Sequence, residues 1–153
     1  MKGPDMPPSF QHQLSIELPV PPADVWAVIA DYRRDPEWRA AVEMTVEPAG
    51  LVTEGAVTDE RLRALGSWTR TTARIRDVVP GRSFRFVSDD GAVEGRRAVE
   101  GTDGGSRLTV WLRVTLPRAM APLARFMGWM FRHRVRRDLA RLRRVVMTRV
   151  AGA

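Results

Sequence analysis

Apolar and polar residues alternate near the start of the chain, and this alternation predicts a strand. In FQHQLSIEL, residues 10–18, the apolar residues and His12 share one set of alternate positions, and polar residues occupy the other set. A period of two residues places alternate side chains on opposite faces, so we expect one face of this strand to be buried. The prolines that follow Leu18 end the strand, because proline has no N–H group for a sheet ladder.

The stretch PPADVWAVIADYRRDPEW, residues 21–38, predicts two short helices. Pro22 suits the first position of a helix, and Asp24 places a negative charge near the positive end of the helix dipole. Apolar side chains then recur at helical spacing, at Val25, Val28, Ile29 and Tyr32. We expect Asp35 to cap a second helix whose first residue is Pro36.

The middle of the chain predicts six further strands. They lie near residues 41–47, 55–65, 67–79, 83–89, 93–101 and 107–116. Glycine, proline and aspartate separate them, and these are the residues that tight turns require. Strands so close in sequence pair antiparallel through hairpins, so we expect one antiparallel sheet of about seven strands.

From about residue 119 to residue 149 the apolar period becomes that of a helix. The expected apolar stripe contains Leu123, Phe126, Met127, Met130, Phe131, Val135, Leu139, Leu142, Val145 and Val146. Thirty helical residues rise roughly 45 Å, and one apolar stripe of this length must pack on the sheet. The pattern therefore predicts an α+β fold, with one domain over residues 9–150 and a flexible, proline-rich tail over residues 1–8.

The net charge of +7 is concentrated near the C-terminal end. Residues 118–153 contain ten arginines and one acidic residue, Asp138, whereas the first 117 residues have a net charge of −2. The arginines are spread around the expected helix and no aromatic residue is expected among them, so we expect no nucleic-acid partner. No run approaches 18 apolar residues and the start lacks the apolar run of a signal peptide, which predicts a cytoplasmic protein without stable membrane insertion. Lys2 is the only lysine, a skew that indicates a GC-rich genome, and we expect a bacterial protein.

The residue types exclude several kinds of chemistry. The chain has no cysteine, which excludes disulfides, thiolate metal sites and cysteine nucleophiles. His12 and His133 are isolated from each other and from carboxylate clusters, so we expect no metal site. No GxSxG motif is present, and the glycine-rich GTDGGS lacks the lysine of a phosphate-binding loop. We therefore expect no cofactor, and no catalytic set can be named.

Three stretches together resemble the START-like helix-grip superfamily, in its SRPBCC, polyketide cyclase/dehydrase and lipid-transport branch. They are VPPADVWAVIADYRRDPEW, ARIRDVVPGRSFRF, and GGSRLTVWLRVTLP followed by MAPLARFMGWMFRHRVRRDLARLRRV. Their order and spacing cover residues 9–149. The resemblance implies a curved sheet wrapped around the long C-terminal helix, with a cavity between them that holds a lipid, sterol, polyketide or other apolar molecule.

We expect the cavity to lie between the sheet and the long helix. Its expected lining consists of Ile75, Phe84, Phe86, Leu112, Val114, Phe126, Met127, Met130 and Arg134. Arg134 and Asp138 interrupt the apolar stripe and are four residues apart, so they can pair with each other. Arg134 could instead bind a carbonyl or acidic end of a ligand, and the apolar residues could instead fill a closed core.

Three classes of function fit the sequence. The first is binding of an apolar small molecule for transport, storage or sensing, and the second is a polyketide aromatase/cyclase that acts in the same cavity. The third is association of the basic helix face with nucleic acid or an anionic membrane, which the spread of the arginines disfavours. The ligand and the oligomeric state stay open.

Overall fold

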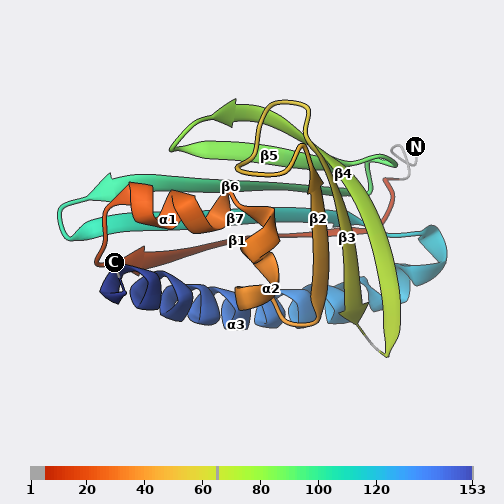
Figure 1. Ribbon diagram of the computed structural model, residues 1–153. Coiled ribbons are helices and arrows are strands. Elements are labelled where there is room, and N and C mark those ends of the chain that lie inside the picture. Colours follow the sequence, from red (N-terminus) through yellow and green to blue (C-terminus); the bar gives the residue numbers. More distant parts are fainter. Residues whose placement is uncertain (1–5, 65, 153) are drawn as a thin grey trace.

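The computed structural model describes residues 6–64 and 66–152, which form one curved sheet, two short helices and one long helix (Figure 1). The strands are β1 (Ser9–Leu18), β2 (Val42–Glu47), β3 (Val57–Ala64), β4 (Ser67–Val79), β5 (Ser83–Ser88), β6 (Val93–Thr102) and β7 (Gly105–Thr115). The helices are α1 (Pro22–Ile29), α2 (Asp35–Trp38) and α3 (Ala124–Ala151), with 3₁₀ turns η1 (Tyr32–Arg34) and η2 (Arg118–Leu123). Of the predicted tail, residues 1–5 lie outside the described residues, and residues 6–8 form neither helix nor strand.

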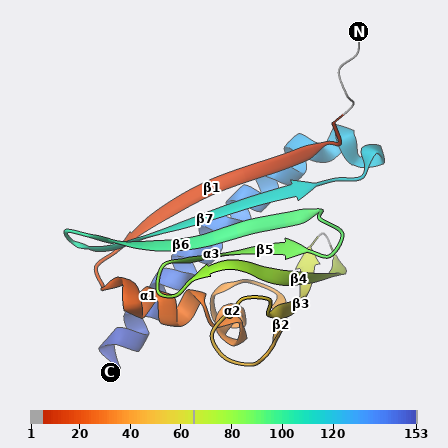
Figure 2. The same cartoon turned by 90° about the horizontal axis from the view of Figure 1, so that it is seen from above.

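All seven strands belong to one antiparallel sheet with the order β1-β7-β6-β5-β4-β3-β2. The two edge strands, β1 and β2, are joined in sequence by α1, η1 and α2. Figure 1 shows β2 and β3 turned across the direction of β1, β6 and β7, and α3 running along one face of the sheet. Figure 2 shows α1 and α2 beside the same curved sheet, near the C-terminal end of α3. The predicted α+β helix-grip fold is confirmed.

Two predictions about helix ends are wrong. Asp35 does not cap α2 but is its first residue, and the capping carboxylate is that of Asp31, which accepts the Arg33 amide at the start of η1. The long helix begins at Ala124 rather than near residue 119, because the preceding segment is a 3₁₀ turn that contains Pro122. Proline has no N–H group for an α-helical hydrogen bond, which favours the tighter turn.

The core is closed beneath α1 and the C-terminal half of α3. Its fully buried side chains include Ile75, Phe84 and Leu108 from the sheet, Val25, Val28 and Ile29 from α1, and Leu142 and Val146 from α3. The N-terminal half of α3 packs differently. Phe126 is 52% exposed and Trp129 is 65% exposed. The sheet and α3 therefore form a close-packed core at one end only.

The N-terminal half of α3 approaches the sheet at β1. Gly128 lies so close to this strand that a Cβ at its position would be 3.1 Å from Phe10 Cβ. The rings of Phe10 and Phe131 stack beside it, with centroids 5.4 Å apart. The missing side chain of Gly128 thus allows α3 to lie against the edge strand.

Candidate ligand-binding site

A buried salt bridge joins β6 to α2. Arg97 on β6 donates from Nη2 to Asp35 Oδ2 at 2.6 Å and from Nη1 to Oδ1 at 3.0 Å. The same Nη1 donates to the carbonyl of Ile29, the last residue of α1, at 2.9 Å. Asp35 is fully buried and Arg97 is 4% exposed. Because a buried charge without a partner is costly, this bidentate pair fixes α2 against the sheet.

Three aromatic rings enclose the Arg97 guanidinium. Its carbon Cζ lies 4.6 Å from the ring centre of Tyr32 and 5.0 Å from that of Trp38. Phe84, on the neighbouring strand β5, is the third, at 5.8 Å. Tyr32 and Trp38 lie three residues before and after Asp35, so the short turn presents both rings beside its carboxylate. Burial lowers the pKa of Arg97, but the charge and hydrogen bonds of Asp35, together with Tyr32, outweigh burial and raise that pKa overall.

The polar network continues from Asp35 to β3. Arg39 Nη1 donates to Asp35 Oδ2 at 3.0 Å and to Glu60 Oε2 at 2.7 Å. Burial raises the pKa of Glu60, but the charge and hydrogen bond of Arg39 outweigh burial and hold that pKa below its ordinary value. Two arginines and two carboxylates thus alternate from the buried Arg97 to the half-buried Glu60, and their charges cancel.

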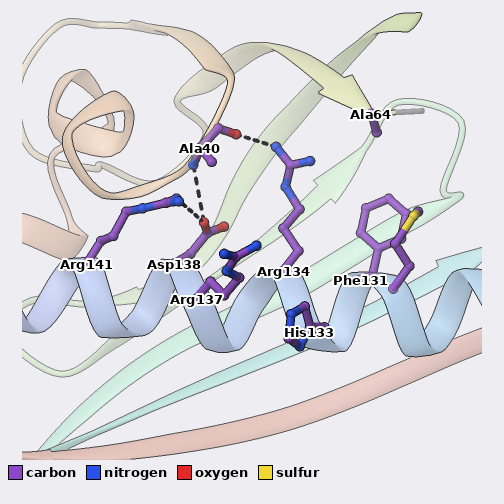
Figure 3. Close-up of a pocket in the computed structure, with 9 residues that line it drawn as sticks. Ala40, Ala64, Phe131, His133, Arg134, Arg137, Asp138 and Arg141 are labelled. Atoms are coloured by element: carbon purple, nitrogen blue, oxygen red, sulfur yellow. Dashed lines mark hydrogen bonds and ion pairs between the residues drawn. The ribbon is translucent and has the colours of Figure 1, made fainter. Parts of the chain in front are cut away.

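A half-open pocket of about 260 Å³ lies beside this network, between α3, the start of β2 and the end of β3 (Figure 3). Its lining consists of Ala40, Ala64, Met130, Phe131, His133, Arg134, Arg137, Asp138 and Arg141. The first four residues supply apolar surface. The charged residues come from α3 alone, and three of them are arginines against one aspartate.

Arg134 and Asp138 hold one rim of the pocket closed by bonding the backbone of the α2–β2 connection. Arg134 donates to the carbonyl of Ala40 and, at 3.1 Å, to that of Arg63 on β3. Asp138 Oδ1 accepts the Ala40 amide and a nitrogen of Arg141, both at 3.2 Å (Figure 3). Burial lowers the pKa of Arg134 and raises that of Asp138. Instead of pairing with each other within salt-bridge distance, the two side chains attach α3 to the same residue, Ala40.

The five strand residues predicted to line the cavity all lie on the inner face of the sheet. They are Ile75, Phe84, Phe86, Leu112 and Val114. Ile75 and Phe84 are fully buried in the core cluster. Leu112 and Val114 are only half-buried, because the N-terminal half of α3 covers this end of the sheet incompletely. Contact of these residues with a ligand stays a prediction.

Phe86 forms part of the inner surface by lying over a glycine. A Cβ at Gly95 on β6 would lie 2.1 Å from Phe86 Cζ, so the ring fills the space that any side chain there would need. This arrangement lays an aromatic face flat on the sheet and leaves it half-buried.

The helix residues of the predicted cavity separate into two groups. Met130 and Arg134 line the pocket, and Met127 is half-buried one turn earlier. Phe126 lies elsewhere: it is half-exposed, and its ring stacks on that of Trp129 at a centroid distance of 6.2 Å. The apolar stripe therefore does not face the sheet along its whole length.

The buried network was missed in the sequence. Asp35 has the residue type and spacing of an N-cap, and Glu60 follows Asp59 in an ordinary polar strand. The one available signal was Arg97, which stands at an inward position of β6 between Gly95 and Val99. A cation at such a position requires a buried carboxylate.

No group of three or more His, Asp or Glu side chains is placed to hold a metal ion in residues 6–64 and 66–152. Over the same residues, no helix has the length and hydropathy needed to cross a membrane.

We predict unequal effects of removing the two partners of the buried pair. Asp35→Asn leaves the buried Arg97 and the half-buried Arg39 without their shared carboxylate, so unfolding free energy should fall by about 3–5 kcal/mol. Arg97→Met should cost less, because Arg39 still neutralises Asp35 and methionine keeps most of the apolar volume. Urea unfolding measures both, and Glu17→Gln, which removes an exposed partner of Arg107, should change stability little. Equal losses for Asp35→Asn and Glu17→Gln would contradict the central place of the buried pair.

We predict that His12 makes the protein less stable in mild acid. Burial, with the charge of Arg132 acting in the same direction, lowers the pKa of His12 from its ordinary value of 6.5, although a backbone hydrogen bond at Gly128 opposes the shift. As the pH falls, the unfolded chain therefore protonates His12 before the folded protein does, which favours unfolding. The stability contributed by the neutral histidine is complete above pH 6.5 and is lost as the pH falls through the pKa of His12 in the folded protein.

Thermal unfolding at neutral pH and near pH 5 tests this prediction. His12→Leu should lose less stability on acidification than the wild type. His133→Leu, which replaces an exposed histidine, is the matched control and should follow the wild type. The same response from all three proteins would show that His12 does not titrate between the two conditions.

Comparison with known proteins agrees with this architecture. Residues 9–147 match the family described as polyketide cyclase / dehydrase and lipid transport. None of the proteins with curated functions matches the sequence. Among solved structures, protein NE0264 from Nitrosomonas europaea is 14% identical with a TM-score of 0.72, covering 93% of this chain and 97% of that one.

Two further structures widen the comparison. The di-domain ARO/CYC protein StfQ of the steffimycin biosynthetic pathway is 14% identical with a TM-score of 0.77; the match covers 95% of this chain and 53% of StfQ. Ara h 8.0201 is 15% identical with a TM-score of 0.61, covering 92% of this chain and 99% of that one. At these identities the solved structures show the fold alone, whereas the family match extends over nearly the whole sequence. The chain thus belongs to the polyketide cyclase/dehydrase and lipid transport family of SRPBCC helix-grip proteins, and this membership implies binding of a hydrophobic ligand.

Proposed function

We propose that the protein binds an apolar small molecule between the inner face of the sheet and the N-terminal half of α3, as a carrier or sensor. The half-open pocket beside Met130 and Phe131 is the observation that carries this proposal. Its volume of about 260 Å³ lies just below the range of about 300–1,000 Å³ that is usual for small-molecule sites. In this proposal the apolar surface continues onto Leu112 and Val114, which lie on the inner face of the sheet and are only half-buried.

The charges around the pocket favour a ligand with an acidic or carbonyl end. Arg134, Arg137 and Arg141 face a single carboxylate, that of Asp138. The hydrogen bonds to Ala40 and Arg63 use two of the five N–H groups of Arg134, so further donors are present at the rim. A ligand would place its apolar body in the pocket and its polar end at the arginines, which is the usual division of contacts in small-molecule sites.

An aromatase/cyclase activity in the same groove is the alternative that the sequence left open. We do not favour it, because the interior groups that could act on a substrate are already engaged. Arg97 and Asp35 bond each other, and burial raises the pKa of Tyr32, so its phenol stays protonated. Mass spectrometry of a bound molecule before and after incubation separates the two functions, since a carrier releases its ligand unchanged.

We predict saturable binding of an apolar fluorescent probe, N-phenyl-1-naphthylamine, and its loss when the pocket is filled. Met130→Trp places an indole in the pocket, so probe affinity should fall by at least about tenfold, with little loss of stability. The matched control is Met147→Trp, because Met147 is 37% exposed on α3 and does not line the pocket. Its probe affinity should equal that of the wild type.

A close-packed site would respond differently to Met130→Trp. Overpacking costs about 1–3 kcal/mol, and the parent protein would then bind no probe. That combination would refute the proposed function.

We predict that Arg134 distinguishes acidic from neutral ligands. Arg134→Met removes the charge but keeps much of the apolar volume, so affinity for dodecanoate should fall by about tenfold or more, as expected for loss of a charged hydrogen bond. Affinity for dodecanol should hold. Displacement of the bound probe measures both, with Arg136→Met, an exposed position on α3, as control.

Two outcomes would exclude Arg134 from ligand recognition. Equal losses for dodecanoate and dodecanol would mean that it only attaches α3 to Ala40 and Arg63. Unchanged affinity for both would place its guanidinium outside the site.

A further inference from the structure

The end of η2 and the N-terminal half of α3 carry exposed apolar side chains on their solvent side. Leu123 is 51% exposed, and Phe126 and Trp129 are exposed to similar or greater extents. Their rings form a stack, since Phe126 packs on Trp129 and Trp129 packs on His133 at a centroid distance of 6.0 Å. Single exposed apolar residues are ordinary, but adjacent ones that include two aromatic rings mark an interaction site.

Unpaired arginines flank this surface. Three arginines share the side of the helix on which Trp129 lies, because each is separated from it by about one or two whole turns. They are Arg125, four residues before Trp129, and Arg132 and Arg136, three and seven residues after it. All three are exposed, and among the described residues none of them has a salt-bridge partner, whereas Arg141 and Arg149 farther along α3 are paired. We call Leu123, Phe126, Trp129 and these three arginines the α3 ridge.

The ridge contains no acidic residue that could offset its charge. Asp138 is the one acidic residue from residue 118 onward, and it is 5% exposed and bonded to Ala40 and Arg141. The outward side of α3 therefore combines uncompensated positive charge with aromatic and aliphatic side chains. The sequence-based expectation that no aromatic residue lies among these arginines is wrong, because Phe126 faces outward and Trp129 lies between them.

We propose that the α3 ridge docks the protein on the surface of an anionic lipid bilayer. Tryptophan and phenylalanine lie favourably at the boundary between headgroups and acyl chains, while arginines beside them bind lipid phosphates. Such docking is peripheral and needs no membrane-spanning element. It rests on the exposed surface of the ridge and does not depend on which molecule the pocket takes.

The charge of the ridge argues against a second copy of the chain as its occupant. A two-fold contact would bring two sets of unpaired arginines together, and like charges opposed in this way are unfavourable. Nucleic acid would share the attraction to cations, but Leu123 offers no ring for stacking on bases, whereas an apolar lipid layer would bury it. Anionic lipid supplies both the negative charge and the apolar layer.

The ridge adjoins the pocket through one residue. His133 stacks on Trp129 and also lines the pocket (Figure 3). A bilayer bound to the ridge would thus lie next to the opening between α3 and β2. Docking would place the pocket at the boundary of the apolar phase in which a hydrophobic molecule resides.

Vesicle co-sedimentation of the full chain tests the proposal. We expect binding to phosphatidylcholine vesicles that contain about one third phosphatidylglycerol, and little binding to phosphatidylcholine alone. Trp129→Ala should weaken binding about tenfold, from the lost burial of one indole. The triple variant Arg125→Gln, Arg132→Gln, Arg136→Gln should weaken it on the order of 100-fold, and added salt should weaken wild-type binding.

Trp68→Ala is the matched control, because Trp68 is also a largely exposed tryptophan, at 46%, but lies on β4. It should bind vesicles as the wild type does. Unchanged thermal unfolding of Trp129→Ala shows that its effect is local, as its exposure predicts.

Several results would overturn the proposal. The first is that the wild type does not bind anionic vesicles. The second is that Trp68→Ala and Trp129→Ala lose equal vesicle affinity. The third is that vesicle binding falls with salt but is unchanged by Trp129→Ala. Tighter binding to single-stranded DNA than to vesicles at the same salt would assign the ridge to nucleic acid. A dimer that dissociates on Trp129→Ala would assign it to self-association.

Discussion

The rest of the structure depends on the buried salt bridge between Arg97 and Asp35. It joins the middle of β6 to the first residue of α2, and the same arginine bonds the carbonyl at the end of α1. The position of α2 in turn sets that of Ala40. The Ala40 carbonyl accepts a hydrogen bond from Arg134 of α3, and the Ala40 amide donates one to Asp138 of the same helix. One ion pair thus orders a series of contacts from the centre of the sheet to the rim of the pocket.

The aromatic enclosure explains why a charge can be held there. Stacked rings and two carboxylates replace the water that Arg97 and Arg39 would otherwise bind, and charges that alternate in sign leave little net field in the core. Replacement of such a pair by apolar residues is often neutral for stability, so its value here lies in orientation. It fixes the two short helices at one end of the sheet and leaves the other end to be covered by α3.

The sequence predicted those features that depend on local pattern. Alternation gave the strands to within a few residues, and Pro22 and the glycine-rich turns marked the boundaries. The Arg97–Asp35 pair could not be predicted in the same way, because its partners are 62 residues apart and Asp35 resembles an ordinary cap. The orientation of Phe126 failed for a different reason. At 100° per residue, Phe126 lies about 160° around α3 from the buried Leu142, so it belongs to the opposite side of the helix although the predicted stripe included it.

Because α3 packs unevenly, its two halves contribute unequally to the free energy of unfolding. Leu139, Leu142 and Val146 anchor its C-terminal half in the close-packed core, the kind of region in which local opening costs the most free energy. The half that begins at Ala124 is held by the close approach at Gly128 and by the backbone bonds of Arg134. Unfolding free energy is therefore distributed unevenly along α3, and the half that begins at Ala124 is the less deeply anchored of the two.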